Sequence, residues 1–277
     1  MSVPYEVTVL FSSDPAQGAS PVGTDGSRFS IEMDSPLTLG DPDNLGWRPT
    51  AVSLAVTRAS IWNTSPNISP AQGFANNTFP FRTGGTAYTI AVPEGLYSLS
   101  ALDSYLSSQF VNLGLSAGLI RLAANDATQS SVLVFENAGD AVDFRPVSGG
   151  GLSGATLRTV LGFDAALYTA PSDSFSIQSS NPAAFNRVNS YLISSTAVNG
   201  LVVNSNTTGV LSQVPIDVAP GSQITYDPRN IIRVPCPELA YGGRQRWDFS
   251  LLDQSGRPAP TGGEYWTFVV TIRYYLV

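Results

Sequence analysis

The sequence has no histidine and no lysine, so arginine supplies all 14 of its basic residues. Without histidine there is no Ser-His-Asp triad, no Cys-His pair and no imidazole metal site. Without lysine there is no P-loop lysine and no Schiff-base nucleophile. These absences exclude most familiar catalytic centres, and we expect no enzyme activity, no cofactor and no metal.

Charge of either sign is also scarce, since Asp, Glu and Arg together make up 13% of the chain and the net charge is -7. Ordinary soluble domains carry about twice that share of charged residues. A neutral polar surface of this kind is typical of a subunit that is buried against other subunits, and it also occurs in secreted proteins. An acidic chain without a basic cluster is not expected to bind nucleic acid directly.

The single cysteine, Cys236, excludes an internal disulfide framework, and its setting between prolines favours a small buried residue in a strand. The first residues, MSVPYEVTVL, lack the basic and long apolar regions of a signal peptide. No apolar run approaches the length of a membrane span. We therefore expect a protein made in its cell without a signal peptide and without a membrane span.

Most of the chain alternates apolar and polar residues, which is the pattern of half-buried strands. Phe29, Ile31 and Met33 are one example, and GLIRLAA and SSVLVFEN read as a hairpin around NDATQ. One helix is expected over 98–110, because its Leu and Phe residues recur at steps of three and four. Short strands joined by Gly/Pro turns, with a single helix, indicate an antiparallel sandwich or barrel.

The strand pattern predicts an all-β fold, a single jelly-roll antiparallel sandwich over 1–277. We expect an N-terminal arm at 1–27, and an inserted helix plus hairpin at 93–186 between strands D and E. Two small jelly rolls divided near residue 180 are the alternative. The expected strands are B (28–38), C (50–61), D (86–92), E (189–197), F (209–217), G (230–236), H (246–252) and I (264–276).

Several local patterns could carry chemistry, but none is complete. Asp227 and Asp248 are the candidate pair for a hydrolase, although their spacing does not select them. DPDN at 41–44 lacks the rest of a calcium loop, and SGGGLSG at 148–154 lacks the lysine of a phosphate loop. The aromatic residues near the C-terminus could form a carbohydrate platform, but alternation on strands favours packing.

Five segments carry a family resemblance. Four of them are SIEMDSPLTL, WNTSPNISP, VPEGLYSLSALDSYL and LGFD. The fifth is the C-terminal pattern, in which a strand containing LLDQSG is followed by a loop and then by a strand that starts with YW. In this order they resemble the penton, or minor capsid, proteins of polinton-like viruses and virophages. These belong to the adenovirus-like, double-jelly-roll virus lineage. The resemblance covers about residues 28–277.

The resemblance implies a structural subunit of an icosahedral capsid with no catalytic residues. It implies homopentamers at the vertices of the virion and contact with the major capsid protein. A small jelly-roll major capsid protein, or a carbohydrate-binding β-sandwich module, is the alternative. We also expect the N-terminal strand, 3–12, to contact a neighbouring subunit or the capsid interior.

The closing strand, EYWTFVVTIRYYLV, is the most apolar of the chain. In a jelly roll of order B-I-D-G it lies between strands B and D, so it is not an edge. Trp266, Phe268, Val270, Ile272 and Tyr274 are expected to face the core. The candidate subunit interface is its outer face together with two arginines of the preceding strand: Thr267, Val269, Thr271, Arg273, Tyr275, Arg244 and Arg246.

Overall fold

The computed structural model describes residues 4–39, 49–70, 75–146, 156–172, 175–186, 188–198, 201–203 and 206–276. The chain forms two compact units. Unit 1 combines Met1–Ser65 with Val188–Val277, and unit 2 is the continuous segment Pro66–Arg187. The motifs at 41–44 and 148–154 lie outside the described residues.

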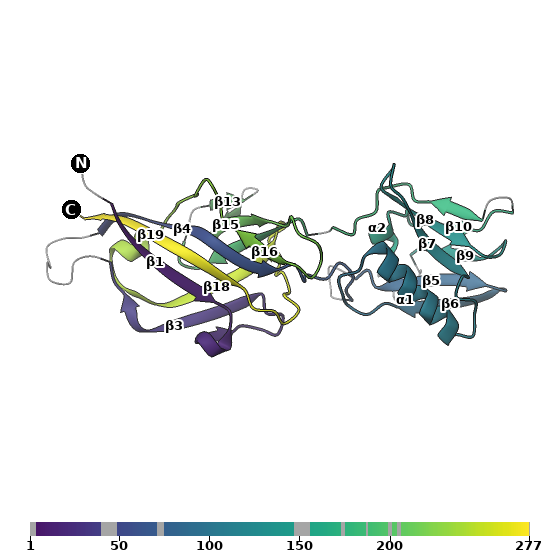
Figure 1. Cartoon of the computed structure of the whole chain (residues 1–277), viewed down its shortest axis with the longest axis horizontal. Coiled ribbons are helices and arrows are strands. Elements are labelled where there is room, and N and C mark those ends of the chain that lie inside the picture. The colour runs from purple at the N-terminus through teal and green to yellow at the C-terminus, as the bar shows by residue number, and fades with distance from the viewer. Residues whose placement is uncertain are drawn as a thin grey trace. The chain divides into compact units, whose positions relative to one another are not determined.

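Unit 1 contains two large antiparallel sheets and the separate two-stranded pair of β13 (Leu201–Val203) and β14 (Asn206–Thr208) (Figure 1). The first, named here the β19 sheet, has the order β1 (Tyr5–Ser12), β19 (Thr267–Leu276), β4 (Pro49–Trp62) and β16 (Gln223–Tyr226), with β17 (Val234–Pro235) also paired to β4. The second, the β18 sheet, has the order β15 (Val210–Pro215), β12 (Ser190–Ser195), β18 (Arg244–Asp253), β3 (Arg28–Leu37) and β2 (Ala19–Pro21). The other small elements are the 3-10 helices η1 (Pro15–Gln17) and η2 (Pro237–Ala240).

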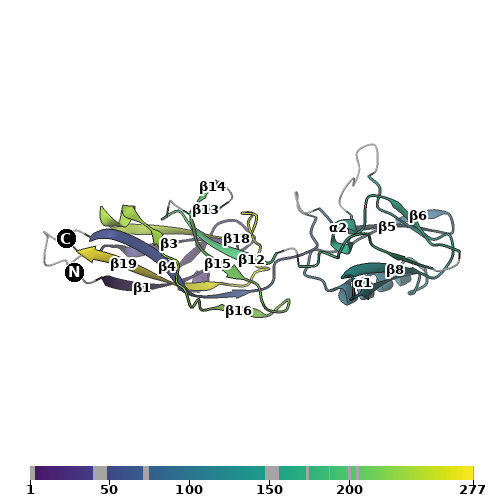
Figure 2. The ribbon, with the colours of Figure 1, turned by 90° about the horizontal axis from the view of Figure 1, so that it is seen from above.

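The two sheets pack face to face around one aromatic core. The ring centroids of Phe11 and Phe249 are 4.5 Å apart, and those of Phe249 and Phe268 are 4.9 Å apart. Phe29 and Trp266 make a further contact between the sheets at 5.1 Å. Figure 2 shows the two layers, with β1 and β16 in one and β3 and β18 in the other. The architecture is an all-β antiparallel sandwich, consistent with a jelly roll.

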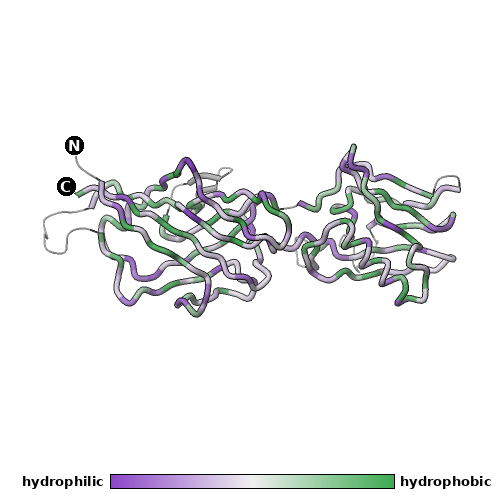
Figure 3. The backbone as a smooth tube through the Cα atoms, viewed as in Figure 1, coloured by the Kyte–Doolittle hydropathy of each residue, from purple (hydrophilic) through white to green (hydrophobic). Residues whose placement is uncertain are grey.

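The structure confirms that the closing strand has a neighbour on each side. β19 pairs with β1 along all eight residues of β1 and with β4 on its other edge. The expected core residues of this segment, including Trp266 and Phe268, are all buried. Hydrophobic and hydrophilic residues are interspersed along the strands, as the colours of Figure 3 show. Successive side chains of a strand lie on opposite faces, so Phe268, Val270 and Ile272 of β19 lie in the core and Val269 and Arg273 lie on the outer face.

The N-terminal segment differs from the arm expected at 1–27. Residues 5–12 form β1, which lies beside β19 in the same sheet, and Ala19–Pro21 form β2 beside β3. The reason is the alternation in YEVTVLFS, which directs Phe11 into the core of its own unit. The strand expected to contact a neighbour or the capsid interior is therefore bound into its own unit along one edge.

Unit 2 has its own fold and core. Its sheets have the orders β10 (Leu167–Thr169), β9 (Ala141–Asp143), β5 (Thr78–Thr83), β6 (Thr86–Ala91), and β11 (Ser176–Gln178), β8 (Ser130–Phe135), β7 (Ile120–Asn125). The helices are α1 (Leu99–Asn112) and α2 (Arg158–Leu161). The helix expected at 98–110 and the hairpin that follows it are confirmed as α1 and β7–β8.

Ser98 caps the N-terminus of helix α1, and its hydroxyl accepts a hydrogen bond from the Ala101 N–H. Leu102, Leu106 and Phe110 form its buried face. The carboxylate of Asp103 is buried beside them. It accepts hydrogen bonds from the Arg121 guanidinium and, at 2.7 Å, from the Leu122 N–H. Asp103 therefore ties α1 to the first strand of the hairpin.

The bounds of the insertion also differ from the sequence expectation of 93–186. Residues 86–92, expected as strand D of the sandwich, contain β6, which pairs with β5 in a hairpin of unit 2. The separate unit accordingly begins at Pro66, and it ends at Arg187. Alternation identified the strand, but its hairpin partner β5 ends at Thr83, only three positions before β6 begins at Thr86.

Candidate subunit interface

The outer face of β19 carries the residues that the sequence proposed for a subunit contact. Val269, Arg273 and Tyr275 are half-buried, as is Thr267, whereas Thr271 is buried within the sheet. The register places Leu10 opposite Val269 on one side and Arg58 opposite it on the other. Leu10 is 63% exposed. The result is a surface of Thr, Val, Leu and Tyr side chains in which the cations are Arg58 and Arg273.

An ion cluster crosses this surface at Arg273. Its guanidinium contacts the Glu6 carboxylate of β1 at 2.6 Å, and Arg233, just before β17, contacts the same oxygen at 3.0 Å. Arg233 Nη1 is buried and has no hydrogen-bond partner. Glu6 thus joins strands on the two sides of the β19–β4 pair. The sequence did not reveal this cluster, because Glu6 and Arg233 are 227 positions apart.

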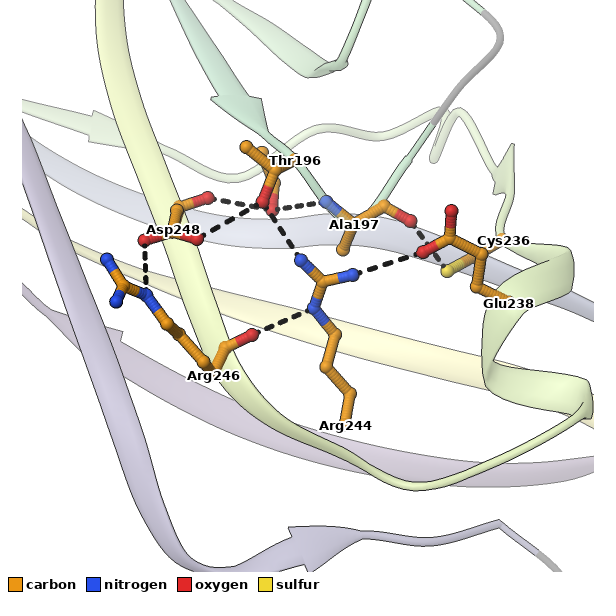
Figure 4. A network of polar contacts seen from close by, with 8 residues as sticks. Thr196, Ala197, Cys236, Glu238, Arg244, Arg246 and Asp248 are labelled. Atoms are coloured by element: carbon orange, nitrogen blue, oxygen red, sulfur yellow. Dashed lines mark hydrogen bonds and ion pairs between the residues drawn. The ribbon is translucent and has the colours of Figure 1, made fainter.

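Arg244 and Arg246 do not join this surface, since both belong to β18 in the opposite sheet. Figure 4 shows Arg244 pointing toward Glu238 and Thr196. It contacts the Glu238 carboxylate at 3.2 Å and the Thr196 hydroxyl at 2.9 Å, and it lies over the Trp247 ring. Arg244 is therefore engaged within its own unit, joining β18 to η2 and to the end of β12.

Arg246 differs from Arg244, because its side chain is 65% exposed. Its Nε donates to Asp248 on the same strand at 3.0 Å, and its cross-strand partner is Glu32 of β3. The side chains of Arg246 and Asp248 lie on the outer face of the β18 sheet, whereas Trp247 and Phe249 point into the core. The seven candidates therefore fall on two separate surfaces of unit 1.

Cys236 is fully buried, as expected, but it lies between β17 and η2 and not in a strand. Burial raises the pKa of its thiol, and the thiol donates a hydrogen bond to the Ala197 carbonyl at 2.9 Å. A protonated, buried thiol is a poor nucleophile. Cys236 thus acts as a packing residue that also satisfies a backbone acceptor.

The structure does not bring the hydrolase candidates together. Asp248 lies on the β18 sheet beside Arg246, whereas Asp227 follows β16 in the β19 sheet and lies 4.0 Å from Arg58. Asp227 pairs with Arg58 outside one sheet and Asp248 lies outside the other, so the core of the sandwich separates the two carboxylates and they cannot flank one glycosidic bond. Trp247 and Trp266 are buried, so neither is available as a carbohydrate platform.

A shallow apolar cleft of about 330 Å³ lies where β4 begins, lined chiefly by Pro49, Pro235, Pro237 and Tyr241. Tyr241 is 87% exposed at its rim. The lining contains no charged residue, so it offers shape and apolar contact but no acid–base group. Across the described ranges, no helix has the length and apolarity needed to span a membrane.

No family model and no curated protein matches the sequence. Among solved structures, the chain is similar to the mavirus penton protein, with a TM-score of 0.47 and 11% identity over 99% of this chain and 100% of that one. Residue roles do not transfer at this identity, so the function is argued from the strand order and surfaces of the chain itself.

Proposed function

We propose that the protein is a structural subunit of an icosahedral capsid: a penton protein that forms homopentamers at the vertices of the virion and contacts the major capsid protein. The observation that carries the proposal is the strand order of unit 1. If β1 is strand B, then β3, β4, β12, β15, β16, β18 and β19 follow as strands C to I. The β19 sheet then has the order B-I-D-G, and the β18 sheet has the order F-E-H-C.

This assignment matches the strand order of a single jelly roll, a fold that viral capsid proteins share with lectins and cupins. Compared with the sequence expectation, the letters B, C, D and G each move to an earlier strand. Unit 2 then lies between strands D (β4) and E (β12), which is where the resemblance to penton proteins implies an insertion. A cupin site usually needs histidine ligands for its metal, and the chain has no histidine.

Composition supports a subunit that is covered on several sides. A chain in which 13% of residues are charged has few charges to desolvate when its surface is buried. The outer face of β19 adds Leu10, Val269 and Tyr275 to that surface. These features favour a structural role over an exposed binding module.

The oligomeric state tests the proposal. The purified chain, at concentrations of tens of micromolar, is expected to scatter light with about five times the 29.3 kDa chain mass. Electron-microscope class averages should show fivefold symmetry. Threefold symmetry would instead favour the small major capsid protein, and a monomer at about 100 µM would overturn the proposal.

A further inference from the structure

The two outer faces of the unit 1 sandwich carry net charges of opposite sign. On the strands of the β19 sheet the charged residues are Glu6, Arg58 and Arg273. Arg233 precedes β17 and Asp227 follows β16, and they offset each other. The balance on this face is therefore positive, in a chain whose net charge is -7.

Arg58 is the cation of this face with the weakest internal partner. Its side chain is 69% exposed, and the nearest carboxylate, Asp227, is 4.0 Å away and 70% exposed. A contact of this kind contributes little to folding, because both groups remain in water. Arg58 is thus free to meet a carboxylate from outside the unit.

The outer face of the β18 sheet carries Glu32, Asp34 and Asp248 against Arg28 and Arg246. Arg244 of β18 is paired with Glu238, so these two charges offset each other. Asp248 is paired with Arg246. Glu32 and Asp34 are exposed on β3, and neither forms an ion pair with any residue in the described part of the chain. This face therefore has a negative balance with two open carboxylates.

We infer that the occupant of each face is a second copy of this chain, with the outer face of the β19 sheet of one copy against the β3–β18 region of the next. The contact is heterologous, because pairing the β19 sheet with itself would bring Arg58 and Arg273 toward their own equivalents. Pairing the β18 sheet with itself would bring Glu32 and Asp34 together. A heterologous contact closes into a ring when its rotation allows, and like-charge contacts disfavour the other pairings.

This inference rests on the proposed function and makes it more specific. In this arrangement, both surfaces that carry the predicted interface residues take part in the same subunit contact. The outer face of β19, with Val269 and Tyr275, is one side of the contact. Arg246 belongs to the other side, and Arg244 supports it from within.

The test is a charge exchange between the faces. One variant carries Arg58→Glu, the second carries Glu32→Arg and Asp34→Arg, and the third combines all three changes. Glu94→Arg with Asp126→Arg is the matched control, because both residues are exposed in unit 2. Light scattering over a concentration series measures the dissociation constant of each oligomer, and tryptophan fluorescence checks that unit 1 remains folded.

The first two variants are expected to weaken assembly by at least about tenfold, and the combined variant to restore it to within about threefold of the wild type. The control should assemble as the wild type does, and raising the salt concentration should weaken the wild-type contact. If the wild type assembles and the reversed variants assemble equally well, this inference is wrong while the proposed function stands. Folded reversed variants that fail to assemble and are not rescued by combination also overturn it. A wild type that stays monomeric overturns the proposed function itself.

Discussion

Unit 1 and unit 2 build their cores from different kinds of contact. In unit 1 the central strand of one sheet, β19, pairs with β1, so residues 5–12 meet residues 267–274. In unit 2 the main pairings are the hairpins β5–β6 and β7–β8, and α1 packs beside β7. Contacts that are distant in sequence cost more chain entropy to form than local ones. The fold of unit 1 therefore depends on pairing between the two ends of the sequence. The fold of unit 2 depends on contacts between segments that are close in sequence.

The difference can be measured because all four tryptophans, Trp47, Trp62, Trp247 and Trp266, belong to unit 1. Tryptophan fluorescence reports the unfolding of unit 1 alone. Far-UV circular dichroism reports both units. A transition seen by dichroism but not by fluorescence is therefore the unfolding of unit 2.

The largest effect is expected from Phe11→Ala in β1. Phe11 is 1% exposed and contacts the rings of Phe249 and Phe268, so its removal leaves a cavity between the sheets. The free energy of unfolding of unit 1 should fall by about 3–5 kcal/mol. Urea unfolding followed by tryptophan fluorescence measures it.

Phe81→Ala is the control, since Phe81 is equally buried in unit 2. It should shift the dichroism transition and leave the fluorescence transition in place. If Phe11→Ala and Phe81→Ala shift both transitions together, the two units are not separate in stability.

A smaller loss is expected from Asp103→Ala in unit 2. The change removes the acceptor of the Arg121 guanidinium and leaves the buried Leu122 N–H without a partner. Unit 2 should lose about 1.5–3 kcal/mol, because Arg121 itself is exposed enough to be solvated. Dichroism in urea measures this loss.

Ser104→Ala, on the exposed side of the same helix, serves as the control and should change the stability of unit 2 little. Equal losses from the two substitutions would mean that α1 is sensitive to any change. The Asp103 link would then have no special role.

The smallest effect concerns pH. Hydrogen bonds from the Arg145 guanidinium, at 2.7 and 2.8 Å, lower the pKa of Asp143 below its ordinary value, and Arg82 adds to this. A lowered pKa in the folded state means that the pair stabilises unit 2 above the unfolded pKa of about 3.9. That contribution is lost as the pH falls through the folded pKa.

Arg145→Gln should therefore cost unit 2 about 0.5–1 kcal/mol at neutral pH. The difference from the wild type should shrink as the solution is made acidic. Dichroism transitions in urea at a series of pH values measure it. A difference that is the same at all pH values would exclude Asp143 as the titrating group.

The sequence predicted strands and faces better than it predicted partners. The alternation in 266–275 was sufficient to divide β19 into a core face and an outer face. The four-residue spacing of Leu102, Leu106 and Phe110 was sufficient to predict helix α1 and its buried face. Alternation does not say which strand lies alongside. For this reason 5–12 was expected as an arm, and 86–92 was expected in the sandwich.

The polar contacts were less predictable still. Asp103 offered a signal, because it is the only charge on the helix and lies beside Leu102 on the buried side. A carboxylate in that position needs a partner, although the sequence does not name Arg121. The cluster of Glu6 with Arg233 and Arg273 had no comparable signal, since it depends on strands being adjacent in the folded sheet.

The pairing of β1 with β19 also sets an order of events on the ribosome. Residues 66–187 are synthesised before β19, so the hairpins and helix of unit 2 can form while the chain is still growing. β1 emerges first but must wait for its partner strand, which is translated after the rest of the β19 sheet. The surface proposed for assembly therefore exists only once β19 has been made.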